Sequence, residues 1–232
     1  MKDINILAAD TSGKMLTAAI LKNDKLLALA RENTGLTHSE TFLPRLIELF
    51  EEANMTLRDI DLFSCVNGPG SFTGLRIGIA SFKALAQVTK KPMAEVSALD
   101  GLYMSVKDEC NVVCSMIDAR REEVYAAVYK DGEKIFGDEP VRITDLAQLL
   151  NKTADRVLIN GDGAIAYKDK IIGLTQGRAF LPDDDKLLQN AYYSGLCAFL
   201  KFKKGETVTY DSFNVNYIKP SQPEMKMKGK AE

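Results

Sequence analysis

The stretch Asn67-Gly68-Pro69-Gly70-Ser71-Phe72-Thr73-Gly74-Leu75-Arg76-Ile77-Gly78 decides the fold of this chain. It follows the apolar run 62–66, which is typical of a buried strand, and it leads into the apolar segment 75–88, which has helical length. Within the stretch, Gly68 and Gly70 allow positive φ values, and Pro69 fixes its own φ. The pattern therefore predicts a strand, a tight turn and a helix.

The start of this helix has its own capping chemistry, because the side chain of Ser71 or Thr73 can accept a hydrogen bond from the first free amides. A Walker A phosphate loop would place Lys and then Ser or Thr after the last glycine, whereas Leu75 and Arg76 follow Gly74. An anion at the helix N-terminus is an alternative. We favour close helix packing as the reason for the glycines.

One stripe of the predicted helix is almost bare backbone, because Gly70, Gly74 and Gly78 recur every four residues and Ser81 nearly continues the row. Each interior glycine costs about 1 kcal/mol relative to alanine in an exposed helix, so close packing must offset the loss. The other faces are apolar too, apart from a narrow polar edge. A helix that is apolar nearly all round is buried on both sides, which predicts a second helix from this chain or from a partner.

A second helix with a wide apolar stripe is predicted after Thr37, which is spaced from Glu40 as in a capping box, and it runs to about Ala53. Its apolar positions are Phe42, Leu43, Leu46, Ile47, Leu49, Phe50 and Ala53. The only histidine of the chain, His38, is followed four residues later by Phe42 and not by a second ligand. One imidazole makes a weak metal site, so we expect no metal ion.

Length and composition are those of an ordinary globular protein: 232 residues, of which 46% are hydrophobic and 27% charged. No apolar run is long enough to span a bilayer, and the first residues carry no signal-peptide pattern, so we expect a cytoplasmic protein. The four cysteines lack paired spacing and are interpreted as free, mostly buried thiols. A net charge of −2 gives no electrostatic footprint for nucleic acid, so any RNA contact should be indirect.

The order of predicted elements suggests two α/β units in tandem. Strands at 4–9, 15–21 and 25–31 precede the first helix, the central stretch and a strand at 92–96, and a short helix at 98–106 leads to the second unit. That unit contains strands at 112–117, 123–129 and 156–159 and helices at 144–150 and 186–203. We place the subdomains at 1–104 and 105–232, with a weakly packed extended segment at 211–232 that could return to the first subdomain.

The turn Asp10-Thr11-Ser12-Gly13 and its counterpart Asp118-Ala119-Arg120-Arg121 resemble those of the actin-like ATPase superfamily, the fold of sugar kinases, Hsp70 and actin, which is RNase H-like. With His38-Ser39-Glu40, the central stretch and Gly161-Asp162-Gly163-Ala164, the chain resembles the TsaB family over essentially its whole length. That family comprises non-catalytic subunits of the bacterial machinery that makes threonylcarbamoyladenosine (t6A) at position 37 of tRNA. The resemblance implies an α/β fold of two duplicated actin-like subdomains.

The same resemblance implies the partners. The chain would pair with TsaD, the catalytic paralogue, through helices of the first subdomain, and would join a ternary complex with the ATPase TsaE. Alone it would form a homodimer, since an exposed apolar patch of this size is rarely left wet. It would touch tRNA only indirectly and would not bind a membrane. The expected interface residues are Phe42, Leu43, Leu46, Phe50, Phe72, Gly74, Arg76, Ile77, Gly78 and Ser81.

A residual nucleotide site is a second hypothesis. Its candidate residues are Asp10, Thr11, Ser12, Gly161 and Gly163. In ATP-binding members of the superfamily, Gly-rich hairpins clamp phosphates and an acid organises magnesium, but here Arg120 and Arg121 stand where the second hairpin needs glycines. The alternative for Asp10 is a turn that hydrogen-bonds its own backbone. Arg120 and Arg121 could pair with Glu122, with Glu123 or with a carboxylate of a partner.

These observations favour a scaffold or activator subunit that is not itself an enzyme, with no catalytic residue, metal or cofactor of its own. The alternative is a nucleotide-binding actin-like enzyme or sensor that uses Asp10 and the Gly161 turn. A third hypothesis, a metallopeptidase, requires a metal pair or a second histidine that this chain does not contain.

Overall fold

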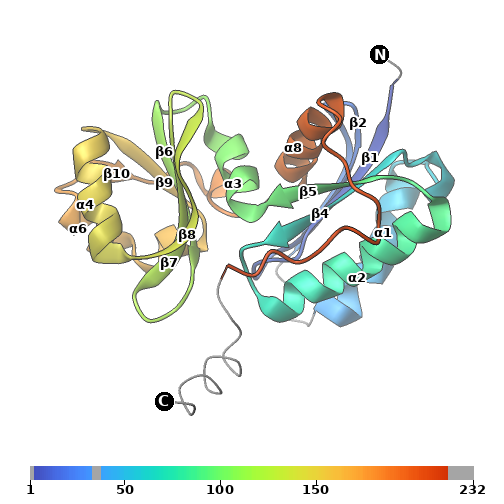
Figure 1. Ribbon diagram of the computed structural model, residues 1–232, viewed down its shortest axis with the longest axis horizontal. Helices are drawn as coiled ribbons and strands as arrows, with labels where there is room; N and C mark the ends of the chain where they lie inside the picture. Colours follow the sequence, from blue (N-terminus) through green and yellow to red (C-terminus); the bar gives the residue numbers. More distant parts are fainter. Residues whose placement is uncertain (1–2, 33–37, 219–232) are drawn as a thin grey trace, which may run out of the picture.

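A computed structural model describes residues 3–32 and 38–218 as two α/β subdomains side by side (Figure 1). Each subdomain is built on a five-stranded sheet. The first sheet has the order β3-β2-β1-β4-β5. Its strands are β1 Asn5–Asp10, β2 Leu16–Lys22, β3 Lys25–Glu32, β4 Leu62–Gly68 and β5 Met93–Ser97. The first three strands pair antiparallel, and β1-β4 and β4-β5 pair parallel.

The second sheet repeats this topology with the order β10-β9-β6-β7-β8. Its strands are β6 Val112–Asp118, β7 Glu123–Lys130, β8 Glu133–Arg142, β9 Val157–Asn160 and β10 Ala179–Phe180. Again three strands pair antiparallel, and the sheet then continues through two parallel pairs. The two sheets therefore share one connectivity, which confirms the predicted duplicated α/β fold.

Helices cover both faces of the first sheet. The described residues form the helices α1 His38–Glu52, α2 Phe72–Thr89, α3 Ala98–Val106, α4 Ile143–Thr153, α5 Asp162–Ala166, α6 Lys168–Leu174, α7 Asp184–Leu187 and α8 Ala191–Lys203, with a 3-10 turn, η1, at Leu57–Asp59. Of these, α1 and α2 lie on one face of the first sheet and α8 on the other. Successive side chains of a strand point to opposite faces. Accordingly, Leu7 packs in the core under α1 and α2, whereas Ile6 and Ala8 pack in the core under α8. Figure 1 shows α3 between the two sheets.

Several elements differ from the sequence prediction. Strand β8, the short strand β10 and helices α5 and α6 were not anticipated, because β8 is largely polar and the others are only two to seven residues long. The single helix predicted at 186–203 is wrong, since the chain is extended at Leu188 and α8 starts afresh. Asn190 caps this new start by accepting a hydrogen bond from the Tyr192 amide at 3.0 Å. The Thr37 half of the predicted capping box lies outside the described residues.

The chain returns to the first subdomain after the second sheet. Helix α8 packs on β1, β2 and β5, and Val208 forms a bridge with Met93 of β5. The weak packing expected for the segment from residue 211 is wrong for its described part, because the Phe213 side chain is fully buried. Residues 219–232 lie outside the described part. We therefore propose a discontinuous first subdomain, residues 1–104 with 191–218, in place of a boundary at residue 104.

The turn that opens α2 has the predicted chemistry. Gly68 and Gly70 have φ values of +140° and +156°, which only glycine adopts readily. Ser71 is the N-cap residue, and its Oγ accepts a hydrogen bond from the Gly74 amide at 3.3 Å. In the part of the chain that the structure describes, no helix is both long and apolar enough to cross a membrane.

The bare stripe of α2 packs against the chain itself. A Cβ atom added at Gly78 would overlap the hydroxyl oxygen of Thr11 and come within 2.9 Å of Cys65 Sγ. The same hydroxyl donates a hydrogen bond to the Gly74 carbonyl at 2.8 Å. The glycine row was expected to admit a close neighbour, and that neighbour is the turn after β1 of the same subdomain.

This packing makes Gly78→Ala destabilising, although alanine is the better helix former. We expect a loss of about 1–3 kcal/mol in the free energy of unfolding, because α2 must lift from the Thr11 turn to make room for the methyl group. Urea unfolding followed by circular dichroism measures it. Gly173→Ala in α6 is the control, since an added Cβ there meets nothing within 4 Å, and it should gain up to about 1 kcal/mol. A Gly78→Ala protein as stable as the wild type would contradict the tight packing.

Candidate partner-binding and nucleotide sites

The turn after β1, proposed as half of a nucleotide site, forms hydrogen bonds and packing contacts within its own chain. Asp10, Thr11 and Ser12 are almost completely buried. The Asp10 carboxylate accepts hydrogen bonds from the Ser12 amide at 2.8 Å and from the Ser12 hydroxyl at 2.6 Å. The Ser71 amide donates to the Ser12 carbonyl at 2.7 Å, and an added Cβ at Gly70 would lie 2.6 Å from Ser12 Cβ. The stretch before α2 therefore covers this turn directly.

The two glycines proposed for the other half serve close packing. Gly161 has a φ of +95°, and an added Cβ would overlap the carbonyl oxygen of Met116 in β6. Gly163 was expected in a turn but lies within α5, where a Cβ would come within 3.0 Å of Val124 Cγ1. The Gly161 amide donates to the Leu187 carbonyl at 2.7 Å. Both glycines thus let α5 approach the second sheet.

Asp162 connects this region to the hairpin after β6. Its carboxylate accepts a hydrogen bond from the Asp118 amide at 3.0 Å. Burial raises the pKa of Asp162, while the hydrogen bonds that it accepts and the Lys14 ammonium act in the opposite direction. Lys14 follows the turn after β1, so this part of the first subdomain lies near enough to Asp162 for the two charges to interact. Neither of the two turns proposed for a nucleotide presents a glycine-lined phosphate loop there.

The hairpin Asp118–Glu123 has a strained backbone. Arg120, Arg121 and Glu122 have positive φ values of 68°, 55° and 63°, which are uncommon for residues with side chains. The pairing suggested for Arg120 with a neighbouring glutamate is wrong, because Arg120 Nη1 lies 3.5 Å from Asp118 Oδ2. Glu122 instead pairs with Lys170 of α6 at 2.5 Å. Arg121 forms no ion pair within the described part of the chain.

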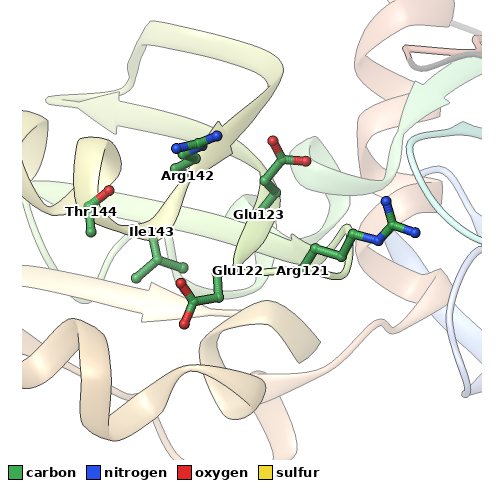
Figure 2. A pocket seen from close by; sticks show the side chains of 6 residues that line it. All are labelled: Arg121, Glu122, Glu123, Arg142, Ile143 and Thr144. Atoms are coloured by element: carbon green, nitrogen blue, oxygen red, sulfur yellow. The ribbon is translucent and has the colours of Figure 1, made fainter. Parts of the chain in front are cut away.

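A pocket of about 400 Å³ lies beside this hairpin (Figure 2). It is lined by Arg121, Glu122, Glu123, Arg142, Ile143 and Thr144. None of the five residues proposed for a nucleotide lines it. Ligand sites generally have polar groups that converge on one point. In Figure 2 the side chain of Arg121 extends away from Arg142, so the two guanidinium groups lie apart in this view.

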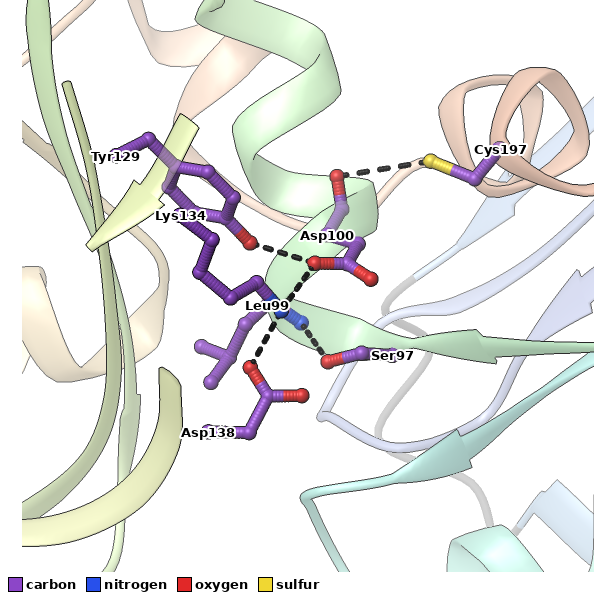
Figure 3. Close-up of polar contacts among 7 residues, drawn as sticks. All are labelled: Ser97, Leu99, Asp100, Tyr129, Lys134, Asp138 and Cys197. Carbon is purple, nitrogen blue, oxygen red and sulfur yellow. Dashed lines mark hydrogen bonds and ion pairs between the residues drawn. The ribbon is translucent and has the colours of Figure 1, made fainter. Parts of the chain in front are cut away.

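The two subdomains are joined by a polar cluster, the interdomain clasp, made of Asp100, Tyr129, Lys134 and Asp138 (Figure 3). Asp100 of α3 accepts a hydrogen bond from the Tyr129 hydroxyl of β7 at 2.6 Å and pairs with Lys134 Nζ of β8 at 2.6 Å. Lys134 also pairs with Asp138 at 2.9 Å. On the first-subdomain side, Cys197 Sγ of α8 lies 3.7 Å from the Asp100 carbonyl.

The electrostatics of the clasp stabilise the hydrogen bonds and ion pairs within it. Burial and the neighbouring Asp100 charge raise the pKa of Tyr129, so the hydroxyl keeps the proton that it donates. Burial by itself would lower the pKa of Lys134, but the hydrogen bond to Asp100 and the carboxylate charges outweigh it and raise that pKa. Tyr129 also stacks on Tyr103 with ring centroids 3.8 Å apart. The clasp therefore holds α3, and with it the first subdomain, against the second sheet.

Four of the expected interface residues lie in the core of the chain itself. They are Phe42, Leu46, Gly74 and Gly78. The rings of Phe42 in α1 and Phe82 in α2 stack with centroids 5.9 Å apart. This contact joins the two helices on their buried side. Phe72 stacks on Tyr217. Ser81 Oγ donates to the Ile77 carbonyl at 2.9 Å within the helix.

The outer surface of α1 and α2 carries large apolar side chains that the chain does not cover. Leu43 and Ile47 of α1 are 52% and 62% exposed, and Val88 of α2 is 79% exposed. Arg45 pairs with Glu32 of edge strand β3 at 2.9 Å, so the opposite flank of α1, which carries Leu43 and Ile47, lies toward α2.

On α2, exposed residues recur every four positions on the outer side. We call the combined surface the α1–α2 face, and it consists of Leu43, Ile47, Arg76, Ala80, Ala84 and Val88. Leu43 and Arg76 were expected here from the sequence, whereas Ile47, Ala80, Ala84 and Val88 were not. The available signal was the alanine row spaced four residues apart, which runs beside the more conspicuous glycine row.

The cysteines are free, as expected, and three of the four are buried. Burial raises the pKa of the Cys65 and Cys114 thiols and raises that of Cys197 to about 12, so these groups stay protonated. Among the described residues, no three His, Cys, Asp or Glu side chains gather in a way that could hold a metal ion. The side chain of His38 lies outside the described part, so its expected lack of a metal role stays a prediction.

Comparisons with known proteins agree with this architecture. Residues 32–200 match the family model of TsaD, the tRNA N6-adenosine threonylcarbamoyltransferase. The tRNA threonylcarbamoyladenosine biosynthesis protein TsaB of Bacillus subtilis is 30% identical over 182 residues, which cover 77% of this chain and 80% of that protein.

Two solved structures extend the comparison. YeaZ from Pseudomonas aeruginosa superimposes with a TM-score of 0.75 at 26% identity, over 92% of this chain and 99% of that one. The ROK hexokinase from Thermus thermophilus superimposes with a TM-score of 0.52 at 11% identity, over 87% and 100% of the two chains, which shows a shared fold alone. With this actin-like fold and a relative that matches most of its length, the chain belongs to the TsaB family.

Proposed function

We propose that the chain is a non-catalytic subunit of tRNA threonylcarbamoyladenosine biosynthesis, and that it pairs with a TsaD-type protein through the α1–α2 face. The observation that carries the proposal is the exposure of Leu43, Ile47 and Val88 on two adjacent helices. Large contiguous patches of exposed apolar side chains usually mark interaction sites, whereas single exposed apolar residues are common on any protein surface. Ala80 and Ala84 between them would let a partner helix approach closely.

The identity of the partner is supported by the family match. Since the TsaD model matches a region that contains both α1 and α2, a TsaD-type protein would offer two equivalent helices. Two such helix pairs can pack face to face as a four-helix interface with an approximate two-fold axis. In the absence of that partner, a second copy of this chain would cover the same face and form a homodimer.

A non-catalytic role is supported by the state of the turn after β1. The Asp10 carboxylate accepts hydrogen bonds from the amide and hydroxyl of Ser12, and the Ser71 amide donates one to the Ser12 carbonyl. A magnesium nucleotide would have to displace both contacts. The chain carries a net charge of −2, which agrees with an indirect relation to tRNA. The proposal therefore assigns the chemistry to the partner.

Charge placed on the α1–α2 face should prevent pairing. We expect Ile47→Arg and Ala84→Arg each to weaken binding to a TsaD-type partner by at least about tenfold, because a buried, unpaired guanidinium is costly and the helices can no longer meet. Size-exclusion chromatography with light scattering on each protein and on the mixture gives the stoichiometry, and calorimetric titration gives the dissociation constant.

The matched control is Ile135→Arg in β8, because Ile135 is an exposed isoleucine of the second sheet. It should form the same one-to-one complex as the wild type. Gly74 and Gly78 variants are unsuitable as interface tests, since they disturb the core contact with Thr11. Complex formation that survives both arginine substitutions on the face would refute the proposed pairing.

Titration of the isolated protein with magnesium ATP tests the nucleotide hypothesis. We expect no measurable heat up to millimolar concentrations. Asp10→Ala should lower the free energy of unfolding by about 1–2 kcal/mol, because Ser12 loses its buried acceptor, but it should leave the affinity for the partner unchanged. Tight binding of ATP that disappears in Asp10→Ala would favour the nucleotide-dependent enzyme or sensor instead.

A further inference from the structure

The segment that follows α8 forms a strap along α2 and β5, which we define as residues 206–217 (Figure 1). Val208 exchanges two backbone hydrogen bonds of 2.8 Å with Met93 of β5. The Phe213 side chain is fully buried in the core of the first subdomain, and its carbonyl accepts a hydrogen bond from Lys83 Nζ at 2.8 Å. The strap is thus an integral part of the first subdomain.

The strap ends against the first turns of α2. The Asn216 amide donates to the Asn67 carbonyl at 2.8 Å. Tyr217 stacks on Phe72 with ring centroids 4.9 Å apart and an interplanar angle of 14°. The Tyr217 hydroxyl accepts a hydrogen bond from Arg76 Nε at 2.8 Å, and the guanidinium carbon lies 5.6 Å from the ring centroid.

These contacts hold Nε of Arg76, the first residue of the exposed row Arg76, Ala80, Ala84 and Val88 on α2. Arg76 is exposed and forms no ion pair with the described residues. Because Nε is held by Tyr217, the two terminal nitrogens, Nη1 and Nη2, remain for another acceptor. The planar fork of a guanidinium matches the two oxygens of a carboxylate, and orientation before binding reduces the entropy lost in the complex.

We infer that Arg76, oriented by Tyr217, binds a carboxylate of the TsaD-type partner and so fixes the register of the helices on the α1–α2 face. Tyr217 is a positioning residue in this arrangement. The inference rests on the proposed function, and it adds to it a charged contact at the N-terminal end of an otherwise apolar face. It also gives the strap a role in partner binding beyond its packing in the core.

A second copy of this chain is a poorer source of the carboxylate. In an antiparallel two-fold pairing of α2 about its midpoint, between residues 80 and 81, Arg76 would lie opposite Leu85 of the other copy. Residues 83–87 around it read Lys-Ala-Leu-Ala-Gln and contain no acidic residue. A partner with an aspartate or glutamate at the equivalent position would therefore be preferred over self-association, which would favour the heterodimer.

The test compares the affinity for a TsaD-type partner among single variants of the full-length protein. We expect Arg76→Glu to raise the dissociation constant at least about 30-fold and Arg76→Gln about tenfold. Tyr217→Phe keeps the stacked ring but removes the hydroxyl acceptor, and it should raise the constant about three- to tenfold. Arg142→Glu, an exposed arginine of the second subdomain, is the matched charge-reversal control and should have no effect.

Two further measurements separate the inferred ion pair of Arg76 from a purely structural role of Arg76 and Tyr217. The melting temperature of Tyr217→Phe and of both Arg76 variants should stay close to that of the wild type. Raising the salt concentration from about 0.05 to 0.5 M should weaken the wild-type complex more than the Arg76→Gln complex, because an ion pair is screened. Equal salt dependence of the two complexes would overturn the inferred ion pair.

The outcomes also distinguish the inference from the proposed function. If Ile47→Arg prevents pairing while Arg76→Glu binds like the wild type, the inferred contact of Arg76 is wrong and the proposed pairing stands. Retained pairing in Ile47→Arg, Ala84→Arg and Arg76→Glu alike would refute the pairing itself. If Tyr217→Phe leaves the dissociation constant unchanged while Arg76→Gln raises it, the positioning role of Tyr217 is wrong. If Arg76→Glu weakens the homodimer but not the complex with a TsaD-type partner, Arg76 binds a second copy of this chain instead.

Discussion

The contact between α2 and the turn after β1 determines how the first subdomain is built. Without side chains at Gly74 and Gly78, the helix backbone lies directly against Thr11, whose hydroxyl binds the Gly74 carbonyl at 2.8 Å. This contact fixes the height of α2 above the sheet. Since Phe42 of α1 stacks on Phe82 of α2, it also fixes where α1 lies. The exposed face formed by both helices therefore depends on a packing contact on their inner side.

The same contact affects the chemistry of the chain. The turn that approaches this helix so closely also has polar groups that bond within the protein, since the Ser12 amide and hydroxyl both donate to the Asp10 carboxylate. The close packing that builds the α1–α2 face thus opposes nucleotide binding at this turn. This link supports the proposal that a fold shared with ATPases binds another protein in this case.

The second subdomain is held in a defined place by contacts that cross the junction. Asp100 of α3 binds Tyr129 and Lys134 of the second sheet, and α8 then returns to cover the far face of the first sheet. The described part of the chain ends beside α2, where Tyr217 packs on Phe72. Segments that precede and follow the second sheet in the sequence therefore contribute to one subdomain, and residues of the strap, 206–217, shape the surface proposed for a partner.

The sequence by itself determined the duplicated α/β fold and the strand, turn and helix around Gly70, because local φ requirements and hydrophobic periodicity are properties of neighbouring residues. It also indicated that α1 and α2 are too apolar for a single sheet face. Only the tertiary structure decided which side of α2 meets the chain and which side is left exposed. That choice depends on contacts between residues far apart in sequence, such as Thr11 with Gly78 and Arg76 with Tyr217, which no local pattern encodes.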